Sequence, residues 1–375
     1  MSSSTMRAVV FKGPFNVALE EQPIPQIQDP TDIIVKVIYT ALCGRSVSRY
    51  LRRCDDDVRA DEDLSDLHVF RGIEKCEPGF IMGHELTGTV IEVGSAVKTV
   101  QKGDKVVSAF TTSCGECFYC KEGWSSRCEK NTLFGCEVLN GGQAEYVRVP
   151  LADGTVLKVP DGIREQLLVL MGDIFPTGYF AAKNAFKEYT AEKISQQTAV
   201  VIGCGPVGLC AVVNALEYKP KHVLAVDSVP SRLEQAKALG AEPWNFMTDR
   251  QGLDERVKEL TNGRGADVVI EVVGLSPALR TAFELVRPFG TISSVGVHNG
   301  EIPWTGQDAY NKNLKTQMGR CPVRSVFPEA LAVLKKNQDK LAFMTQNVMP
   351  LSKAVEAYDL FNSMKVQKVI FEADK

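Results

Sequence analysis

Four cysteines stand close together between residues 114 and 128, and their spacing is typical of a zinc site. Cys114, Cys117, Cys120 and Cys128 give the pattern C-x2-C-x2-C-x7-C. Four thiolates so close in sequence can surround one Zn²⁺ as a tetrahedron, with Zn–S bonds of about 2.3 Å. Such a site has no open position, so we predict a structural zinc that stabilises a lobe with little core of its own. Disulfide pairing is the alternative, but a chain with eleven cysteines and no export signal favours thiols and metal.

A histidine and a glutamate, His84-Glu85, stand directly after Gly83 at the start of a strand-like stretch. An imidazole beside a carboxylate can bind a metal ion or move a proton. The pair alone is a weak signal, because most histidines are hydrogen-bonded core or surface residues. Two more residues of ligand type accompany it: Cys43, at the end of a β-branched strand, and Asp173, before a helix. Each has a plain alternative, since buried free cysteines are common and aspartate often caps a helix.

The stretch from 198 to 227 has the pattern of a dinucleotide-binding unit. An apolar strand, Thr198–Ile202, runs into a G-x-G-x-x-G loop and a helix, and a second strand ends in Asp227. In this context the loop is expected to bind a pyrophosphate at the helix N-terminus. Gly203 allows a tight turn, Gly205 lets the backbone approach the phosphates, and Gly208 allows close packing. Asp227 would bind both adenosine ribose hydroxyls and repel a 2′-phosphate, which favours NAD over NADP.

The rest of the second half alternates between strand and helix patterns. Ligands bind at the carboxyl ends of such strands, so Gly274 and Val297 are expected to line the nicotinamide. Arg232 could flank the adenosine end, although an exposed arginine on a helix is the plainer interpretation. From about Asn313 the sequence predicts helices, and residues 366–372 a last strand.

The elements that position these residues differ between the two halves of the chain. Short β-branched segments punctuated by glycine and proline predict a small β-rich domain first, and βα units predict a parallel sheet afterwards. A length of 375 residues suits two domains, and a hydrophobic content of 44% suits a globular protein. A net charge of −3 gives no support for nucleic-acid or membrane binding. No apolar run reaches membrane-spanning length, so we expect a cytoplasmic protein.

Taken together, these motifs resemble those of the zinc-dependent alcohol dehydrogenases of the medium-chain dehydrogenase/reductase family, over nearly the whole chain. The resemblance implies an α/β protein with an N-terminal, partly open GroES-like β-barrel and a Rossmann domain. The expected division is a catalytic domain over 1–170 with the zinc lobe at about 112–130, a NAD-binding domain over 171–312, and a tail over 313–375 that returns to the catalytic domain. It further implies two zinc ions and NAD per chain, an alcohol, polyol or aldehyde substrate, and a homodimer or homotetramer.

The resemblance also gives roles to individual residues. It implies a catalytic zinc held by Cys43, His84 and Asp173, with Glu85 beside them or as an interchangeable fourth ligand. Three protein ligands leave a position for the substrate oxygen, whose pKa the metal lowers before hydride passes to NAD. His68 would relay the alcohol proton to solvent. The predicted cofactor-binding residues form one set: Thr177, Gly203, Gly205, Pro206, Val207, Gly208, Asp227, Arg232, Gly274 and Val297.

The catalytic motif departs from the family pattern after Cys43. Removal of the twenty residues Ser46–Ser65 would give Cys-Gly-Arg-Asp-Leu-His, a good family sequence. The intervening stretch is polar and highly charged without a clear period, which predicts a loop or disorder. It is either a native lid or a non-native insertion, and Arg45 replaces the usual relaying hydroxyl residue. The alternative function is therefore a zinc- and NAD-binding relative whose catalysis the insertion impairs.

Overall fold

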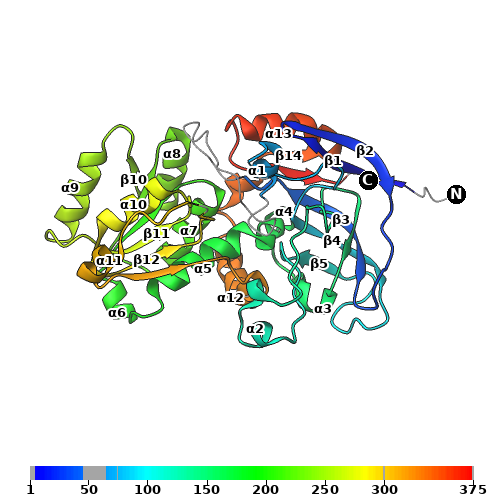
Figure 1. The fold of residues 1–375 in the computed structure, drawn as a ribbon, viewed down its shortest axis with the longest axis horizontal. Helices are drawn as coiled ribbons and strands as arrows, with labels where there is room; N and C mark the ends of the chain where they lie inside the picture. Colours follow the sequence, from blue (N-terminus) through cyan, green and yellow to red (C-terminus); the bar gives the residue numbers. More distant parts are fainter. Residues whose placement is uncertain (1–4, 45–64, 74, 299, 374–375) are drawn as a thin grey trace. The chain divides into compact units, whose positions relative to one another are not determined.

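The computed structural model describes residues 5–44, 65–73, 75–298 and 300–373. It divides into two compact units, one formed by Met1–Pro176 with Pro322–Lys375 and the other by Thr177–Cys321 (Figure 1). No helix in the described ranges is both long and apolar enough to cross a membrane.

The first unit is built on β-strands that are mainly antiparallel. Within the described residues, a sheet in the order β14-β15-β3-β4-β5-β7 also takes in β6, which pairs with β3, and β1 and β2 form a separate hairpin. The strands are β1 (Thr5–Gly13), β2 (Asn16–Pro23), β3 (Ile33–Ala41), β4 (Glu85–Val93), β5 (Lys105–Ser108), β6 (Tyr146–Val149), β7 (Val156–Lys158), β14 (Val348–Pro350) and β15 (Ile370–Glu372).

Short helices fill the connections of this unit, and the C-terminal segment returns to it. Ile370 of β15 pairs with Ala41 at the end of β3, so the C-terminal strand lies beside the segment that carries Cys43. The helices are α1 (Asp66–Phe70), α2 (Phe118–Lys121), η1 (Ser125–Arg127), α3 (Ala152–Thr155), α4 (Glu165–Leu168), η2 (Val169–Gly172), α12 (Val323–Lys336), η3 (Ala342–Thr345), η4 (Leu351–Lys353) and α13 (Ala354–Asn362). Helix α5 (Ile174–Phe186) begins at the boundary between the units.

The second unit is a parallel sheet with the strand order β10-β9-β8-β11-β12-β13 among the described residues. Order reverses between β8 and β11, which is the topology of a doubly wound Rossmann sheet. Its strands are β8 (Thr198–Ile202), β9 (His222–Asp227), β10 (Glu242–Asn245), β11 (Ala266–Glu271), β12 (Val286–Ser294) and β13 (Lys315–Met318). Its helices are α6 (Ala191–Ile194), α7 (Pro206–Glu217), α8 (Pro230–Leu239), α9 (Arg250–Leu260), α10 (Ser276–Leu285) and α11 (Gly306–Lys312).

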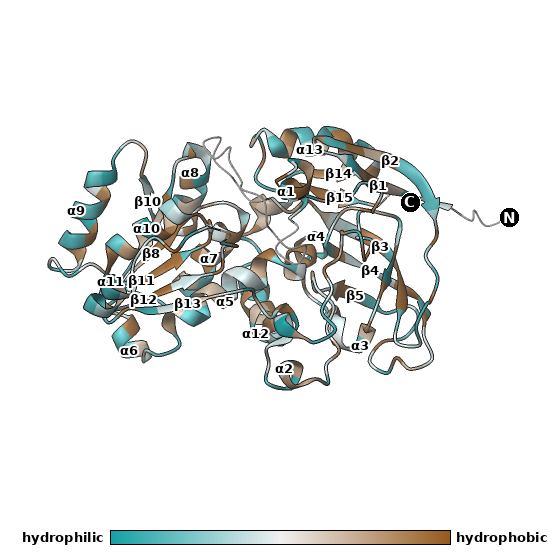
Figure 2. Ribbon diagram, viewed as in Figure 1, coloured by the Kyte–Doolittle hydropathy of each residue, from teal (hydrophilic) through white to brown (hydrophobic). Residues whose placement is uncertain are grey.

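Helices cover both faces of this sheet, as alternate residues of β12 show. Ile292 packs in a buried cluster with Leu253 of α9 and Leu279 of α10. The next residue, Ser293, points to the opposite face and donates its hydroxyl to the carbonyl of Ala181 in α5 at 2.8 Å. Strands buried on both faces are hydrophobic along their length, and Figure 2 shows them mostly brown, whereas α9 carries teal on its outer side.

The prediction of helices from Asn313 onward is wrong for two short strands, β13 at the edge of the parallel sheet and β14 (Val348–Pro350) in the first unit. Asn313 ends α11 in a left-handed conformation, and Lys315–Met318 forms β13, which pairs with β12 at the edge of the sheet. The sequence Lys-Thr-Gln-Met is polar and mostly exposed, because an edge strand of a sheet can face solvent. It therefore has neither the apolar run nor the clean alternation that would have identified it.

Candidate metal centres and nucleotide site

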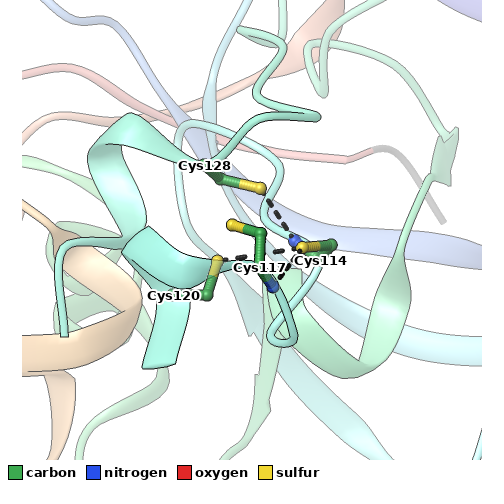
Figure 3. A group of neighbouring side chains, drawn as sticks. All are labelled: Cys114, Cys117, Cys120 and Cys128. Atoms are coloured by element: carbon green, nitrogen blue, oxygen red, sulfur yellow. Dashed lines mark hydrogen bonds between the residues drawn. The ribbon is translucent and has the colours of Figure 1, made fainter. Parts of the chain in front are cut away.

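The four clustered cysteines converge on one point, as their spacing predicted. The sulfur atoms of Cys114, Cys117, Cys120 and Cys128 all lie within 4.8 Å of one another (Figure 3). Backbone amides point at the sulfurs: Cys114 N donates to Cys128 Sγ at 3.2 Å, and Cys117 N to Cys114 Sγ at 3.3 Å. Such N–H donors stabilise thiolates and orient metal ligands. Four sulfur donors at this separation fit a tetrahedral zinc site.

A second ligand group forms in the same unit. One ligand atom each from Cys43, His84, Glu85 and Asp173 lies within 4.8 Å of the others. Cys43 Sγ is 3.5 Å from Asp173 Oδ2, and His84 Nε2 is 3.7 Å from the same oxygen. The structure thus brings together all four residues that the sequence proposed for the catalytic zinc.

Antiparallel pairing explains why residues so distant in sequence meet. Ala41 at the end of β3 pairs with Glu85 at the start of β4, so Cys43 and His84 emerge at the same end of the sheet. Gly83 precedes the histidine with φ +97°, and a Cβ there would lie 2.5 Å from the Gln143 side chain. Only glycine suits both the left-handed backbone and the close approach.

Unpartnered buried atoms support the fit of a metal ion to this group. In the described part of the chain, Glu85 Oε2 is buried without a hydrogen-bond partner, although Glu85 Oε1 bonds to Lys368 Nζ at 2.5 Å. A buried carboxylate oxygen left without a partner is costly, and a cation would satisfy it. One thiol, one imidazole and two carboxylates form a donor set suited to Zn²⁺, with a position left for substrate if three of them bind.

Two residues in contact with this group were not assigned a role from the sequence. Asp66 is 1% exposed and accepts hydrogen bonds from the backbone nitrogens of Cys43 at 2.9 Å and Gly83 at 3.1 Å. Lys368 is also 1% exposed and binds Glu85 and the carbonyl of Leu42 at 2.9 Å. Asp66 stood in the Asp-x-His motif, which is the signal that could have found it. Lys368 lies 283 residues from Glu85, and no local pattern connects them.

The charges of the group shift its pKa values in the absence of metal. Burial alone would lower the pKa of His84, but Asp66, Asp173 and Glu85 outweigh it and raise the value to about 9. Burial raises the pKa of the Cys43 thiol well above its ordinary value, and the Asp173 charge adds to the effect. Burial also raises the pKa of Glu85 to about 7, although the Lys368 ammonium opposes this. At neutral pH these shifts keep Cys43 and His84 protonated in the metal-free site and leave Glu85 about half protonated.

Zinc uptake by the metal-free site is therefore expected to strengthen steeply as pH rises. Zinc binds a thiolate and a neutral imidazole, so the proton of Cys43 and that of His84 must leave on binding. Two displaced protons give an affinity that rises about 100-fold per pH unit between pH 7 and 8, below the raised pKa values of both groups, and less steeply as the pH approaches the His84 pKa. Competition with a chelator at several pH values would measure the slope. Cys43→Ser should reduce it to about tenfold per unit, and a slope near zero in the parent protein would contradict this protonation scheme.

The predicted proton relay and the proposed insertion also belong to the first unit. His68 lies in α1, two residues after Asp66, and is 4% exposed. The ligand group does not include it among the described residues, and its relay role stays a prediction. Arg45 and residues 46–64 of the proposed insertion lie outside the described residues. Ser65 is described and directly precedes α1.

The glycine loop of the second unit has the geometry that the motif predicted. Gly203 has φ +96°, so it takes the left-handed conformation of a tight turn. A Cβ on Gly208 would lie 1.8 Å from the carbonyl oxygen of Gly203, whereas a Cβ on Gly205 would meet no atom within 4 Å. Helix α7 begins at Pro206 with Gly205 as its N-cap. The loop is thus packed on one side and open at Gly205, beside the helix N-terminus where a phosphate would bind.

Asp227 closes this loop from the end of β9. Its Oδ2 accepts from Cys204 N at 2.7 Å, and its Oδ1 accepts from Ser228 N and Val229 N at 2.7 and 2.9 Å. Arg232 is 9% exposed with Nη1 at 3.8 Å from Asp227 Oδ2, so the plainer interpretation of an exposed arginine is wrong. Arg232 lies in the N-terminal turn of α8, which faces the Asp227 carboxylate, and this position explains why the arginine side chain is buried.

The two strand ends expected at the nicotinamide lie side by side. A Cβ on Gly296 would be 2.3 Å from the nitrogen of Gly274, so the loops after β11 and β12 are in contact, and Val297 follows directly. Gly274 N in turn donates to the buried carboxylate of Glu271 at 2.5 Å. Thr177 lies in the first turns of α5 and is 9% exposed. Binding roles for these residues stay predictions.

The fold and the two ligand groups define a zinc-binding oxidoreductase with a Rossmann unit, and comparison with known proteins gives the family. Residues 206–336 match the zinc-binding dehydrogenase family and residues 29–161 the alcohol dehydrogenase GroES-like domain. Over 372 residues the chain is 71% identical to zinc-type alcohol dehydrogenase B of Aspergillus flavus, covering 99% of this chain and 82% of that protein. It is 52% identical over 311 residues to a medium chain reductase/dehydrogenase of an Acremonium species, covering 83% of this chain and all of that protein (100%).

A comparison with solved structures leads to the same family. Alcohol dehydrogenase TADH from Thermus sp. ATN1 matches with a TM-score of 0.86 and 32% identity, over 98% of this chain and 100% of that one. The chain therefore belongs to the zinc-binding medium-chain alcohol dehydrogenase family. This confirms the predicted family, the GroES-like and Rossmann fold, and the enzyme class of zinc-type alcohol dehydrogenases.

Proposed function

We propose that the protein transfers a hydride between an alcohol, a polyol or an aldehyde hydrate and NAD, with one catalytic and one structural zinc per chain. The convergence of Cys43, His84, Glu85 and Asp173 on one point carries this proposal. Zinc at this site would supply Lewis-acid chemistry that lowers the pKa of a bound alcohol toward neutrality. NAD would supply the hydride acceptor.

The protein's own residues would hold and orient these groups. Cys43, His84 and Asp173 would bind the metal and leave one position for the substrate oxygen. Glu85, held by Lys368 at Oε1, has its buried Oε2 without a hydrogen-bond partner and could replace a departing ligand. His68 would accept the alcohol proton and pass it to solvent. Asp227 and the Gly203 loop would bind the adenosine ribose and the pyrophosphate.

Metal analysis combined with a panel of alcohols and aldehydes tests the proposal. The parent protein is expected to contain two zinc ions per chain and to reduce NAD with at least one alcohol of the panel. In the alternative function the insertion impairs catalysis, although Cys43 lies within the ligand group. One zinc per chain with no turnover would favour that alternative and contradict the proposal.

Asp227 is expected to determine whether the protein prefers NAD or NADP. A carboxylate at this place repels a 2′-phosphate, so we expect NAD to bind at least ~10-fold more tightly than NADP, about 1.4 kcal/mol. Fluorescence titration of both cofactors measures the ratio. Asp227→Asn keeps an oxygen acceptor for Cys204 N and removes the charge, so the preference should shrink. Equal affinities in the parent protein would show that Asp227 does not face the ribose.

We further propose that the protein is a homodimer or homotetramer. Strand β13 is the edge of the parallel sheet in the described part of the chain, and its outer backbone groups are open to pairing with another strand. Self-complementary pairing of two such edges is a common route to a symmetric dimer. Light scattering of the purified protein would distinguish the two assemblies, and a monomer would contradict both.

A further inference from the structure

A chain of buried side chains connects the C-terminal helix α13 to the candidate catalytic ligands. Tyr358 of α13 donates its hydroxyl to Gln143 Oε1 at 2.9 Å. The same amide donates from Nε2 to Asp66 Oδ2 at 3.2 Å. Tyr358 and Gln143 are both 0% exposed, and Asp66 is 1% exposed. Solvent therefore cannot substitute for any of these contacts.

Asp66 is where this chain meets the ligand group. It accepts from the backbone of Cys43 and of Gly83, and its Oδ1 lies 3.8 Å from His84 Nδ1. One carboxylate thus contacts both ligand-bearing segments and faces the ring nitrogen that points away from Asp173. At 3.8 Å this last contact is an ion pair and not a hydrogen bond, so Asp66 acts on the site mainly through the two backbone nitrogens that it holds, with its charge facing the histidine ring.

The direction of the hydrogen bonds is fixed along the chain. Burial raises the pKa of Tyr358 well above its usual value, so the hydroxyl keeps its proton and acts as the donor. Gln143 must then present its oxygen to Tyr358 and its NH₂ group to Asp66. Its side chain also lies against Gly83, where a Cβ would be 2.5 Å away, and its own backbone bonds to Met82 and Val9. The amide consequently has little freedom to turn or move.

We propose that Tyr358 and Gln143 are positioning residues, which hold Asp66, and through it Cys43 and His84, in the geometry that retains the catalytic metal. The inference rests on the proposed function. It gives the C-terminal segment a role in metal retention although its residues are not in the ligand group. The segment contributes twice, since Lys368 near β15 holds Glu85 of the same group.

The two metal sites within one chain provide an internal control. The Cys114–Cys128 cluster has its own backbone donors and shares no residue with the relay of hydrogen bonds that runs from Tyr358 through Gln143 to Asp66. Tyr358→Phe removes only the hydroxyl and leaves the ring against Phe70, whose centroid is 5.0 Å away. Zinc should then leave the catalytic site about tenfold or more faster in excess dipicolinate, while the four-cysteine zinc leaves at its parental rate. The visible spectrum of Co²⁺ loaded into the catalytic site should also change.

Matched variants separate positioning from general damage. Tyr189→Phe removes another tyrosine hydroxyl, one that lies 3.3 Å from Thr291 Oγ1 in the second unit, and should not alter zinc loss at either site. Gln143→Met breaks the relay from its middle and should reproduce the selective loss, even if Tyr358→Phe does not fold. The double variant Tyr358→Phe/Gln143→Met should lose zinc no faster than the more severe single variant, because both act through Asp66.

The measurements distinguish a failure of the relay from a failure of the proposed function. A parent protein that binds a single zinc overturns the proposed function and the relay with it. A parent with two zinc ions, combined with parental zinc loss in Gln143→Met or equal acceleration at both sites, overturns the relay alone. Selective loss from the catalytic site in the relay variants, with Tyr189→Phe unchanged, supports it.

Discussion

Replacing Cys117 by serine is expected to remove one of the two zinc ions and to destabilise the protein markedly. The lobe that this zinc would hold has little hydrophobic core: α2 contains no buried residue, and Phe118 and Trp124 are 60% and 50% exposed. A metal that binds only the folded state at 1,000 times its dissociation constant contributes about 4 kcal/mol, and a loss of that order is expected here. Zinc analysis and thermal unfolding of the variant and the parent would measure both effects.

The control is a cysteine outside the cluster. Cys136 is 7% exposed and donates its thiol to the carbonyl of Leu133 at 3.2 Å, a bond that a serine hydroxyl can replace. Cys136→Ser should therefore keep both zinc ions and unfold close to the parental temperature. If Cys117→Ser also kept full zinc and an unchanged transition, the four cysteines would not form a structural zinc site.

Local sequence patterns were sufficient to predict the sites whose residues lie close together in the sequence. The four cysteines lie within fifteen residues, and the glycine loop lies between a strand and a helix that follow one another along the chain. In both cases spacing alone restricts the geometry. Cys43, His84 and Asp173 are separated by up to 130 residues, and only the family resemblance connected them. Their meeting depends on the register of β3 with β4, which no single motif encodes.

The contacts around those ligands could not be predicted in this way. Tyr358 and Gln143 are 215 residues apart, and their types are ordinary for a helix and a turn. A buried polar group is satisfied by whichever partner the fold brings near it, so its partner is a property of tertiary packing. The edge strand β13 was missed for a related reason, since its pairing partner determines its conformation more than its own polar sequence does.

The segments that flank the proposed insertion are hydrogen-bonded to each other. Cys43 N donates to Asp66 Oδ2 at 2.9 Å, and Leu67 N donates to the carbonyl of Cys43 at 3.1 Å. If Ser46–Ser65 were deleted, Leu67 would stand four residues after Cys43, and that second bond would become an ordinary helical one. The ligand-bearing ends thus already have the spacing that the shorter chain requires.

Deleting Ser46–Ser65 is therefore expected to leave the fold and both zinc ions in place and to raise the turnover rate. Loop closure costs only about 0.6 kcal/mol per doubling of length, so stability should change little. Catalytic geometry is less tolerant, because a displacement of about 1 Å can cost ~100-fold in rate, and the insertion begins three residues after a metal ligand. Steady-state kinetics of the full chain, the deletion variant and a variant with a glycine-serine segment of equal length would separate the effects of length and sequence. A deletion variant that loses activity present in the full chain, without rescue by the glycine-serine segment, would identify Ser46–Ser65 as a working lid and contradict the expectation that the segment impairs catalysis.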